Sequence, residues 1–116
     1  MTKIARGQVW DVNLNPATGA EIQKIRPCVV VSADQMGRLP LKVVVPITAW
    51  NDSYAGCPWL VRLEPDPLNG LKKASAADAF QVKSLSTDRF VRQRGVLSDD
   101  QVTDIVAAVG IVIQIF

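Results

Sequence analysis

The 116-residue sequence predicts a mainly β fold with one C-terminal α-helix, arranged as a small β-barrel or twisted sheet packed on that helix. Short apolar segments rich in β-branched residues alternate with Gly-, Pro- and Asn-rich turns, which is typical of strands. Only the segment that begins at Ser98 shows the spacing of apolar residues that is typical of an α-helix. No repeat or linker divides the chain, so residues 1–116 are predicted to form a single domain.

Seven segments are predicted to be β-strands. The first, residues 8–14, alternates apolar and polar side chains, as a half-buried strand does. The second, residues 27–31, is a continuous β-branched run and is expected to be buried on both faces. Trp10 and Trp59 are expected in the core, because both fall in predicted strands. The full set is residues 8–14, 27–31, 41–45, 59–63, 73–77, 80–85 and 94–97.

The predicted helix begins with a capping box, in which Ser98 caps the first turn and Gln101 bonds back to the cap. Two aspartates in the first turn suit the positive end of the helix dipole. One helical face is apolar and comprises Val102, Ile105, Val106, Val109 and Ile113. Residues 110–116 could also form a strand by composition, so the sequence leaves the helix end open.

Composition excludes several classes of protein and site. No segment is long and apolar enough to span a membrane, and residues 1–7 contain no apolar core of a signal peptide, so we expect a cytoplasmic protein. Cys28 and Cys57 are expected to be free thiols, with a disulfide or a reactive cysteine as the alternative. The chain has no histidine and its acidic residues are scattered, so neither a metal site nor a cofactor is expected.

Charge is slightly uneven along the chain. Residues 1–50 contain six basic and three acidic residues, whereas residues 51–116 contain seven basic and eight acidic ones. This asymmetry is compatible with a local anion-binding groove, and equally with an ordinary solvated surface.

Three residues at strand edges could act together on a phosphate. Glu21 and Arg26 flank the loop that leads into the second strand, and Thr48 follows the third strand. If these strands are neighbours, their ends meet. A guanidinium fork and a hydroxyl can then donate hydrogen bonds to phosphate oxygens, while a carboxylate accepts a proton or orients the arginine. By spacing alone, the sequence favours an Arg–Glu surface pair beside a structural threonine over such a site.

The order of several short motifs resembles the MazF/PemK family of bacterial toxins, from Arg6 to about Ile113. Each motif is weak alone, and the combination is fairly specific. In chain order they are Arg6-Gly7-Gln8-Val9-Trp10, Asn15-Pro16, Gly19-Ala20-Glu21, Arg26-Pro27-Cys28-Val29-Val30-Val31, Pro46-Ile47-Thr48, Gln81-Val82-Lys83-Ser84 and Asp88-Arg89-Phe90.

The resemblance implies an SH3-like barrel, a homodimer, and a metal-independent endoribonuclease that cuts single-stranded RNA at short sequences. It also implies a cognate antitoxin whose C-terminal segment covers the active groove. Arg26 and Thr48 match the family's catalytic residues, and Glu21 matches an acidic residue that shapes activity. Gln81 and Arg89 match positions along the RNA path, and we add Lys24 to these RNA-binding candidates.

Two departures from the family pattern fall in the loop before Arg26. The family often continues Glu-Gln-x-Gly after its acidic residue, whereas this chain has Glu21-Ile22-Gln23-Lys24. Ala20 replaces a common serine and removes one hydroxyl. These departures are compatible with the same chemistry, and they leave open the shape of this loop and the RNA sequence that is preferred.

The expected reaction is attack of the RNA 2′-hydroxyl on its own phosphodiester, giving a 2′,3′-cyclic phosphate. Arg26 or Glu21 would be the general base, and an arginine is an awkward one because its pKa exceeds about 12. Trp50 is a candidate platform for base stacking, with a packed loop aromatic or a dimer contact as alternatives. Other functions left open are a same-fold toxin that poisons DNA gyrase by protein contact, and a barrel that binds RNA without cutting it.

Overall fold

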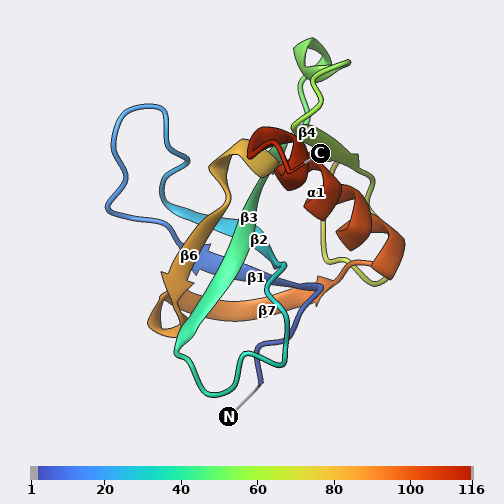
Figure 1. Ribbon diagram of the computed structural model, residues 1–116. Coiled ribbons are helices and arrows are strands. Elements are labelled where there is room, and N and C mark those ends of the chain that lie inside the picture. The colour runs from blue at the N-terminus through green and yellow to red at the C-terminus, as the bar shows by residue number, and fades with distance from the viewer. Residues whose placement is uncertain (1–2, 116) are drawn as a thin grey trace.

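The computed structural model describes residues 3–115 (Figure 1). Met1, Thr2 and Phe116 lie outside the described residues, so the expectations placed on them stay predictions. The strands and the helix are β1 (Gln8–Asn13), β2 (Ile25–Val30), β3 (Leu41–Ala49), β4 (Leu60–Leu63), β5 (Ser75–Asp78), β6 (Lys83–Ser86), β7 (Phe90–Val96) and α1 (Asp99–Val112). The predicted class, mainly β with one C-terminal helix, is confirmed.

The strands form one antiparallel sheet in the order β4-β5-β3-β2-β1-β7, with β6 also paired to β3. Strand β3 pairs with three strands of this sheet, β2, β5 and β6. Its first half pairs with β6, from Leu41 opposite Ser86, and its last residues pair with β5, from Ile47 opposite Ala77. Because β3 changes partner along its length, the sheet bends sharply and curls towards a barrel, although its two edges share no strand ladder.

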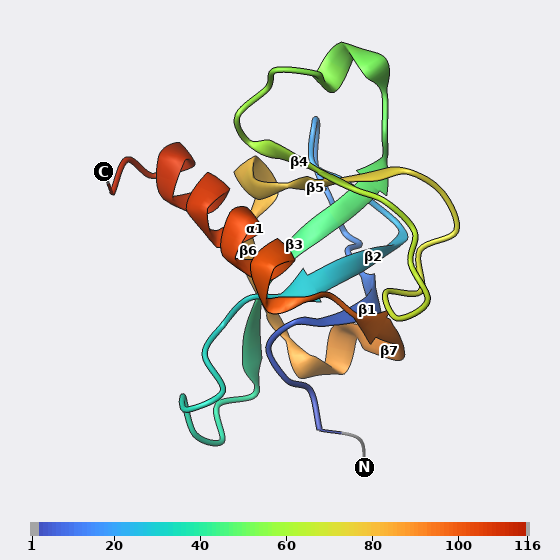
Figure 2. The ribbon, with the colours of Figure 1, turned by 90° about the vertical axis from the view of Figure 1, so that its right-hand side faces the viewer.

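The gap between the sheet edges is bridged by the segment that links β4 to β5, residues 64–74, which we call the closing loop (Figure 2). The Val96 N–H of β7 donates to the Leu68 carbonyl at 2.9 Å. Two glycines make this approach possible. A Cβ added at Gly70 would lie 2.3 Å from the Arg94 carbonyl oxygen, and one at Gly95 would lie 2.2 Å from that of Leu68. The two backbones are therefore in direct contact.

Asn69 holds the closing loop from inside. Its side chain is fully buried, donates to the Glu64 carbonyl at 2.8 Å and accepts from the Leu71 N–H at 3.0 Å. The Asp66 carboxylate accepts from the Asn69 N–H at 2.8 Å. Buried amides with satisfied hydrogen bonds fix backbone conformation, so this loop has one defined shape.

Two apolar clusters fill the interior, one on each face of the central strands. The first packs against α1 and the second lies on the opposite face. Strand β2 contributes to both, with Val29 in the first cluster and Cys28 and Val30 in the second, all fully buried. The prediction of a strand buried on both faces is confirmed for this segment.

The helix begins at the predicted capping box. The Ser98 hydroxyl accepts from the Gln101 N–H at 3.2 Å, and the Gln101 side chain accepts from the Ser98 N–H at 2.9 Å. The helix continues to Val112, which corrects the strand alternative for the start of the tail. Within the predicted apolar face, Val106 and Ile113 are exposed rather than buried. No helix among residues 3–115 is long and apolar enough to cross a membrane.

Three other local predictions were wrong. Strand β7 begins at Phe90 rather than Arg94, and Phe80 lies in a 3-10 turn instead of a strand. Trp10 is buried as expected, but Trp59 precedes β4 and is 37% exposed, packing edge-to-face on Phe80 at 5.8 Å between ring centroids. The contact with Phe80 stabilises the Trp59 ring at the surface, so this tryptophan does not need to be buried in the core.

Candidate active site

A cavity of about 520 Å³ lies where β2, β3 and the closing loop meet. The ladder between β2 and β3 ends at Cys28 opposite Pro46. Continued by two residues, the same register sets Arg26 opposite Thr48, and both residues line the cavity. Pro27 and Pro46 have no N–H to donate, so the ladder cannot continue normally there. The strands are thus unpaired where the cavity opens, and the predicted meeting of Arg26 with Thr48 occurs.

The Arg26 side chain is exposed, and its Nε donates to the Gln23 carbonyl at 3.3 Å. A guanidinium has five N–H donors, so most of its donors remain free for a ligand. None of the ion pairs within residues 3–115 involves Arg26. Thr48 is half-buried beside it, as the second-last residue of β3. Together they offer a rigid cationic fork and a hydroxyl to one anion.

Three further cations line the same cavity, and none of its lining residues is acidic. Lys72 and Lys73 come from the closing loop and Arg94 comes from β7. Arg94 is partly neutralised by Asp11, whose carboxylate lies 3.3 Å from Arg94 Nη1 and also pairs with Arg92. Sequence reasoning missed all three residues; the only signal was the basic pair Lys72-Lys73 at the start of the predicted strand over residues 73–77.

Glu21 lies apart from this cavity. It lines a second one, of about 410 Å³, with Ala20, Phe80 and Gln81 among its neighbours. Its carboxylate is exposed and accepts from the Thr18 N–H at 2.7 Å. The structure therefore does not bring Glu21 together with Arg26 and Thr48, because the loop between them folds away from the cavity.

Gln81 holds that loop in place. Its amide oxygen accepts from the Ile22 N–H at 2.7 Å, and its amide nitrogen donates to the Ala20 carbonyl and to the Asp78 carboxylate, each at 3.3 Å. Burial raises the pKa of the Asp78 carboxyl above its usual value, and hydrogen bonds from Phe80 and Gln81 oppose this rise. Sequence reasoning did not single out Asp78.

Lys24 has a backbone φ of +71°, in the left-handed region that favours glycine. Lys24 stands at the position where the family pattern has glycine. This chain therefore places a lysine in a backbone conformation that favours glycine. The Lys24 N–H donates to the Asn15 side chain at 3.0 Å and its carbonyl accepts from Leu14. Arg89, in the turn just before β7, also holds the start of this loop. Its guanidinium donates to the Asn13 carbonyl at 3.1 Å and to the Asn15 carbonyl.

Trp50 follows β3 directly and is half-buried. Its Nε1–H donates to Asp52 at 3.2 Å, and its ring meets Tyr54 edge-on at 5.8 Å between centroids. The Arg62 guanidinium lies 4.8 Å from the ring centroid, within cation–π range. These contacts fix the ring close to the end of β3 that carries Thr48.

Neither the cysteines nor the acidic residues among residues 3–115 form a further nucleophilic or metal-binding site. Both thiols are free, and burial raises the pKa of Cys28 to about 12, so it stays protonated and is a poor nucleophile. Within residues 3–115, no three His, Cys, Asp or Glu side chains gather in a way that could hold a metal ion.

Comparison with known proteins assigns the family. Residues 5–113 match the model of the PemK-like, MazF-like toxins of type II toxin–antitoxin systems. The chain belongs to this toxin family. It is 34% identical over 97 residues to endoribonuclease MazF9 of Mycobacterium tuberculosis, covering 80% of this chain and 81% of that one.

Solved structures of MazF proteins share the fold. MazF from Deinococcus radiodurans superposes with a TM-score of 0.79 at 23% identity, covering 96% of each chain. A mycobacterial endoribonuclease in complex with its cognate antitoxin gives a TM-score of 0.73 at 21% identity, covering 97% of this chain and 96% of that one. The SH3-like, barrel-type architecture expected of the MazF/PemK family is therefore present.

Proposed function

We propose that this chain is an endoribonuclease, the toxin of a toxin–antitoxin pair, and that it cuts single-stranded RNA without a metal ion. The observation that carries this proposal is the cavity in which Arg26 and Thr48 face each other among further cations and no acidic side chains. Membership of the MazF/PemK family and the similarity to a relative named as an endoribonuclease support it.

The proposed reaction uses the RNA's own 2′-hydroxyl. The 2′-oxygen attacks the adjacent phosphorus and loses its proton, the bond to the 5′-oxygen breaks, and that oxygen takes up a proton. The products are a 2′,3′-cyclic phosphate and a 5′-hydroxyl. Arg26 stabilises the charge that develops on the phosphoryl oxygens, and Thr48 donates one further hydrogen bond to them. Preorganised donors of this kind contribute roughly 3–4 kcal/mol each.

Glu21 is proposed as the proton acceptor in competition with Arg26. Its carboxylate is exposed, with one hydrogen bond from the backbone of its own loop, so it is able to move with that loop. To reach the scissile phosphate, the loop would have to release its contacts with Gln81. A role for Glu21 in the chemistry therefore requires loop movement when RNA binds.

The remaining proposed contacts place RNA across both cavities. Lys24, Gln81 and Arg89 would contact the strand near the Glu21 cavity, and Trp50 would stack a base beyond Thr48. We further propose a cytoplasmic homodimer whose groove is covered by the C-terminal segment of a cognate antitoxin. The solved structure of a mycobacterial endoribonuclease in complex with its cognate antitoxin supports the antitoxin partner.

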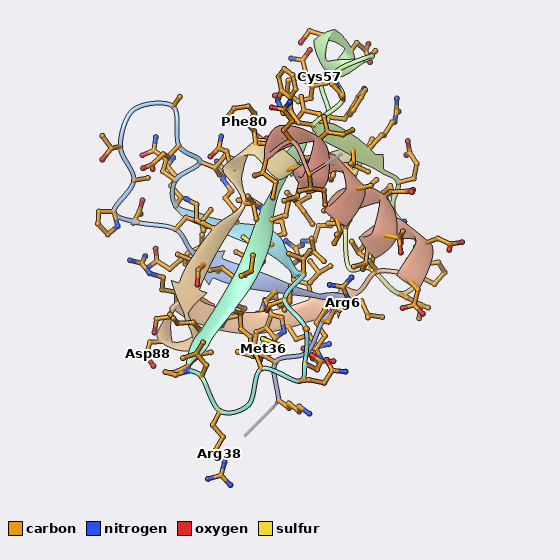
Figure 3. The ribbon with its side chains drawn as sticks, in the orientation of Figure 1. Arg6, Met36, Arg38, Cys57, Phe80 and Asp88 are labelled. Atoms are coloured by element: carbon orange, nitrogen blue, oxygen red, sulfur yellow. The ribbon has the colours of Figure 1, made fainter. Side chains whose placement is uncertain are left out.

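The decisive experiment incubates the purified protein with a mixed RNA pool in EDTA and identifies the ends of the fragments. We expect discrete cuts with cyclic phosphate ends, no cutting at a 2′-O-methyl position, and loss of cutting in Arg26→Ala. Arg38→Ala is the matched control, since Arg38 lies in the exposed turn at the opposite end of β3 from Thr48 (Figure 3).

Three results would contradict the proposal. Cutting at the 2′-O-methyl position would refute attack by the 2′-oxygen. Binding without cuts would indicate a non-catalytic RNA binder, and neither binding nor cuts would point to a protein target such as DNA gyrase. A gyrase poison has no use for a guanidinium and a hydroxyl that converge on one anion, so the geometry disfavours that alternative.

A further inference from the structure

We infer that Lys72 and Lys73, supported by Arg94, form a second phosphate subsite, which holds an RNA phosphate neighbouring the one that is cut. This inference rests on the proposed function, because it assigns the remaining cations of the same cavity. It adds binding residues from the closing loop and β7, two elements that supply none of the proposed catalytic residues.

The position of the two lysines is fixed by strand pairing. The ladder between β3 and β5 sets Thr48 opposite Ala76 and Ala49 opposite Ser75. It extends by one hydrogen bond, in which the Trp50 N–H donates to the Ala74 carbonyl at 3.0 Å. Lys73 is the next residue. The lysines therefore leave the sheet directly beside the strand end that carries Thr48.

The closing loop holds the lysine backbone firmly from the other side. Leu71 is buried in the core cluster that packs against α1. Gly70 lies against the Arg94 backbone, and the buried Asn69 side chain bonds to the loop on both sides of itself. Only the lysine side chains remain free to move, and both residues are exposed. A backbone fixed in this way limits the entropy lost when a ligand binds.

Charge favours an anion at this position. Neither lysine belongs to an ion pair within residues 3–115, whereas Arg94 is paired with Asp11. Arg94 is therefore a supporting cation, and the lysines provide most of the free positive charge. The floor beneath them is apolar, from Pro27, Ile47 and Leu71, and contains no carboxylate to repel a phosphate.

A polyanion fits this arrangement better than a single small anion. The cavity has one set of donors at Arg26 and Thr48 and a second at Lys72 and Lys73, carried on different elements. Consecutive phosphates of one RNA strand can occupy both sets together. The second set contacts no reacting atom, so it should govern affinity and leave the chemical step largely unchanged.

The test compares a Lys72→Gln, Lys73→Gln double variant with wild-type protein and with Arg38→Gln, which removes a remote charge. Affinity for an RNA blocked by 2′-O-methyl at its cut site is measured by anisotropy at several salt concentrations. Each phosphate contact on a single strand contributes about 0.7 to the slope of log K against log salt, so the double variant, which loses the contact with one phosphate, should lose about 0.7. We expect roughly tenfold weaker binding, with kcat at saturating RNA within about twofold of wild type.

A phosphate scan locates the contact. Replacing single phosphates by uncharged methylphosphonates should weaken wild-type binding at one position next to the cut site, and that same replacement should cost the double variant nothing. Unchanged affinity and slope in the double variant would overturn the subsite even if wild-type protein cuts RNA. If wild-type protein neither cuts nor binds RNA, the proposed function itself fails. These two failures are therefore distinguishable.

Discussion

Replacing Gly70 by alanine tests whether the closing loop completes the barrel. The new methyl group would lie 2.3 Å from the Arg94 carbonyl oxygen and 2.7 Å from its carbonyl carbon, both backbone atoms of β7. Gly70 also has a φ of +69°, which L-residues rarely adopt. The substitution thus combines an unfavourable backbone conformation with a clash that no side-chain rotation can relieve.

The two costs can be separated with other glycines of the chain. Gly56 has a φ of +81° and open space around its Cβ position, so Gly56→Ala measures the backbone cost alone, about 1–2 kcal/mol. Gly95 has no left-handed φ and a Cβ position 2.2 Å from the Leu68 carbonyl oxygen, so Gly95→Ala measures the clash alone, about 1–3 kcal/mol. Gly70→Ala should cost both, about 2–5 kcal/mol.

Urea unfolding followed by tryptophan fluorescence measures these free energies. The expected order of destabilisation is Gly70→Ala first, Gly95→Ala second and Gly56→Ala least. Variants that remain folded should also bind RNA more weakly if they clash at the closing loop, because displacement of that loop moves Lys72 and Lys73. If Gly70→Ala is no less stable than Gly56→Ala, the closing loop does not pack on β7 as described.

Three further predictions concern single side chains. Thr48→Val keeps the shape of the side chain and removes its hydroxyl, so kcat for RNA cleavage should fall about 10²–10³-fold, whereas Thr48→Ser should retain most activity; equal rates would exclude a catalytic hydroxyl. Lys24→Gly relieves the left-handed backbone and should raise the free energy of unfolding by about 0.5–1 kcal/mol in urea, and a loss of stability would contradict this. A thiol reagent at pH 8 should label Cys57 and spare the buried Cys28, whose pKa is about 12, until the protein unfolds; two labelled thiols in the native protein would disprove the burial.

The sequence was most informative where side-chain pattern and local hydrogen bonding act alone. The capping box at Ser98 and the buried run of β2 are set by residues adjacent in the chain, and both were predicted correctly. The meeting of Arg26 with Thr48 followed from assuming that two consecutive strands are neighbours. Consecutive strands often are, which explains why this part of the site was accessible from the sequence.

The rest depended on contacts between distant segments. Lys72 and Lys73 reach the cavity only because Gly70 allows the closing loop to pack on β7, and the local pattern showed nothing beyond a turn. Glu21 was expected beside Arg26 because the two are close in sequence, but its loop is drawn towards Gln81, sixty positions further along the chain. Neither the packing of the closing loop on β7 nor the binding of the Glu21 loop by Gln81 produces a periodic pattern in the sequence.

The start of β7 was missed for a related reason. Two of its residues are the charged Arg92 and Arg94, which a local sequence pattern does not mark as part of a strand, and the pairing with β1 accounts for them. Asp11 on β1 lies 3.0 Å from Arg92 Nε and 3.3 Å from Arg94 Nη1, so one carboxylate balances the two arginines across the ladder. Cross-strand charge pairs of this kind stabilise an edge strand that is polar by composition.

The inferred phosphate subsite would couple RNA affinity to stability through the closing loop. The loop bridges the sheet edges, and the same loop carries the lysines of the inferred phosphate subsite, so its conformation cannot change without affecting both. The loop that carries Glu21 is different: it is exposed, and side-chain hydrogen bonds from Gln81 tie it to the barrel. Changes there should alter which RNA sequence is bound at little cost in stability, whereas changes around Asn69 and Gly70 should reduce both properties together.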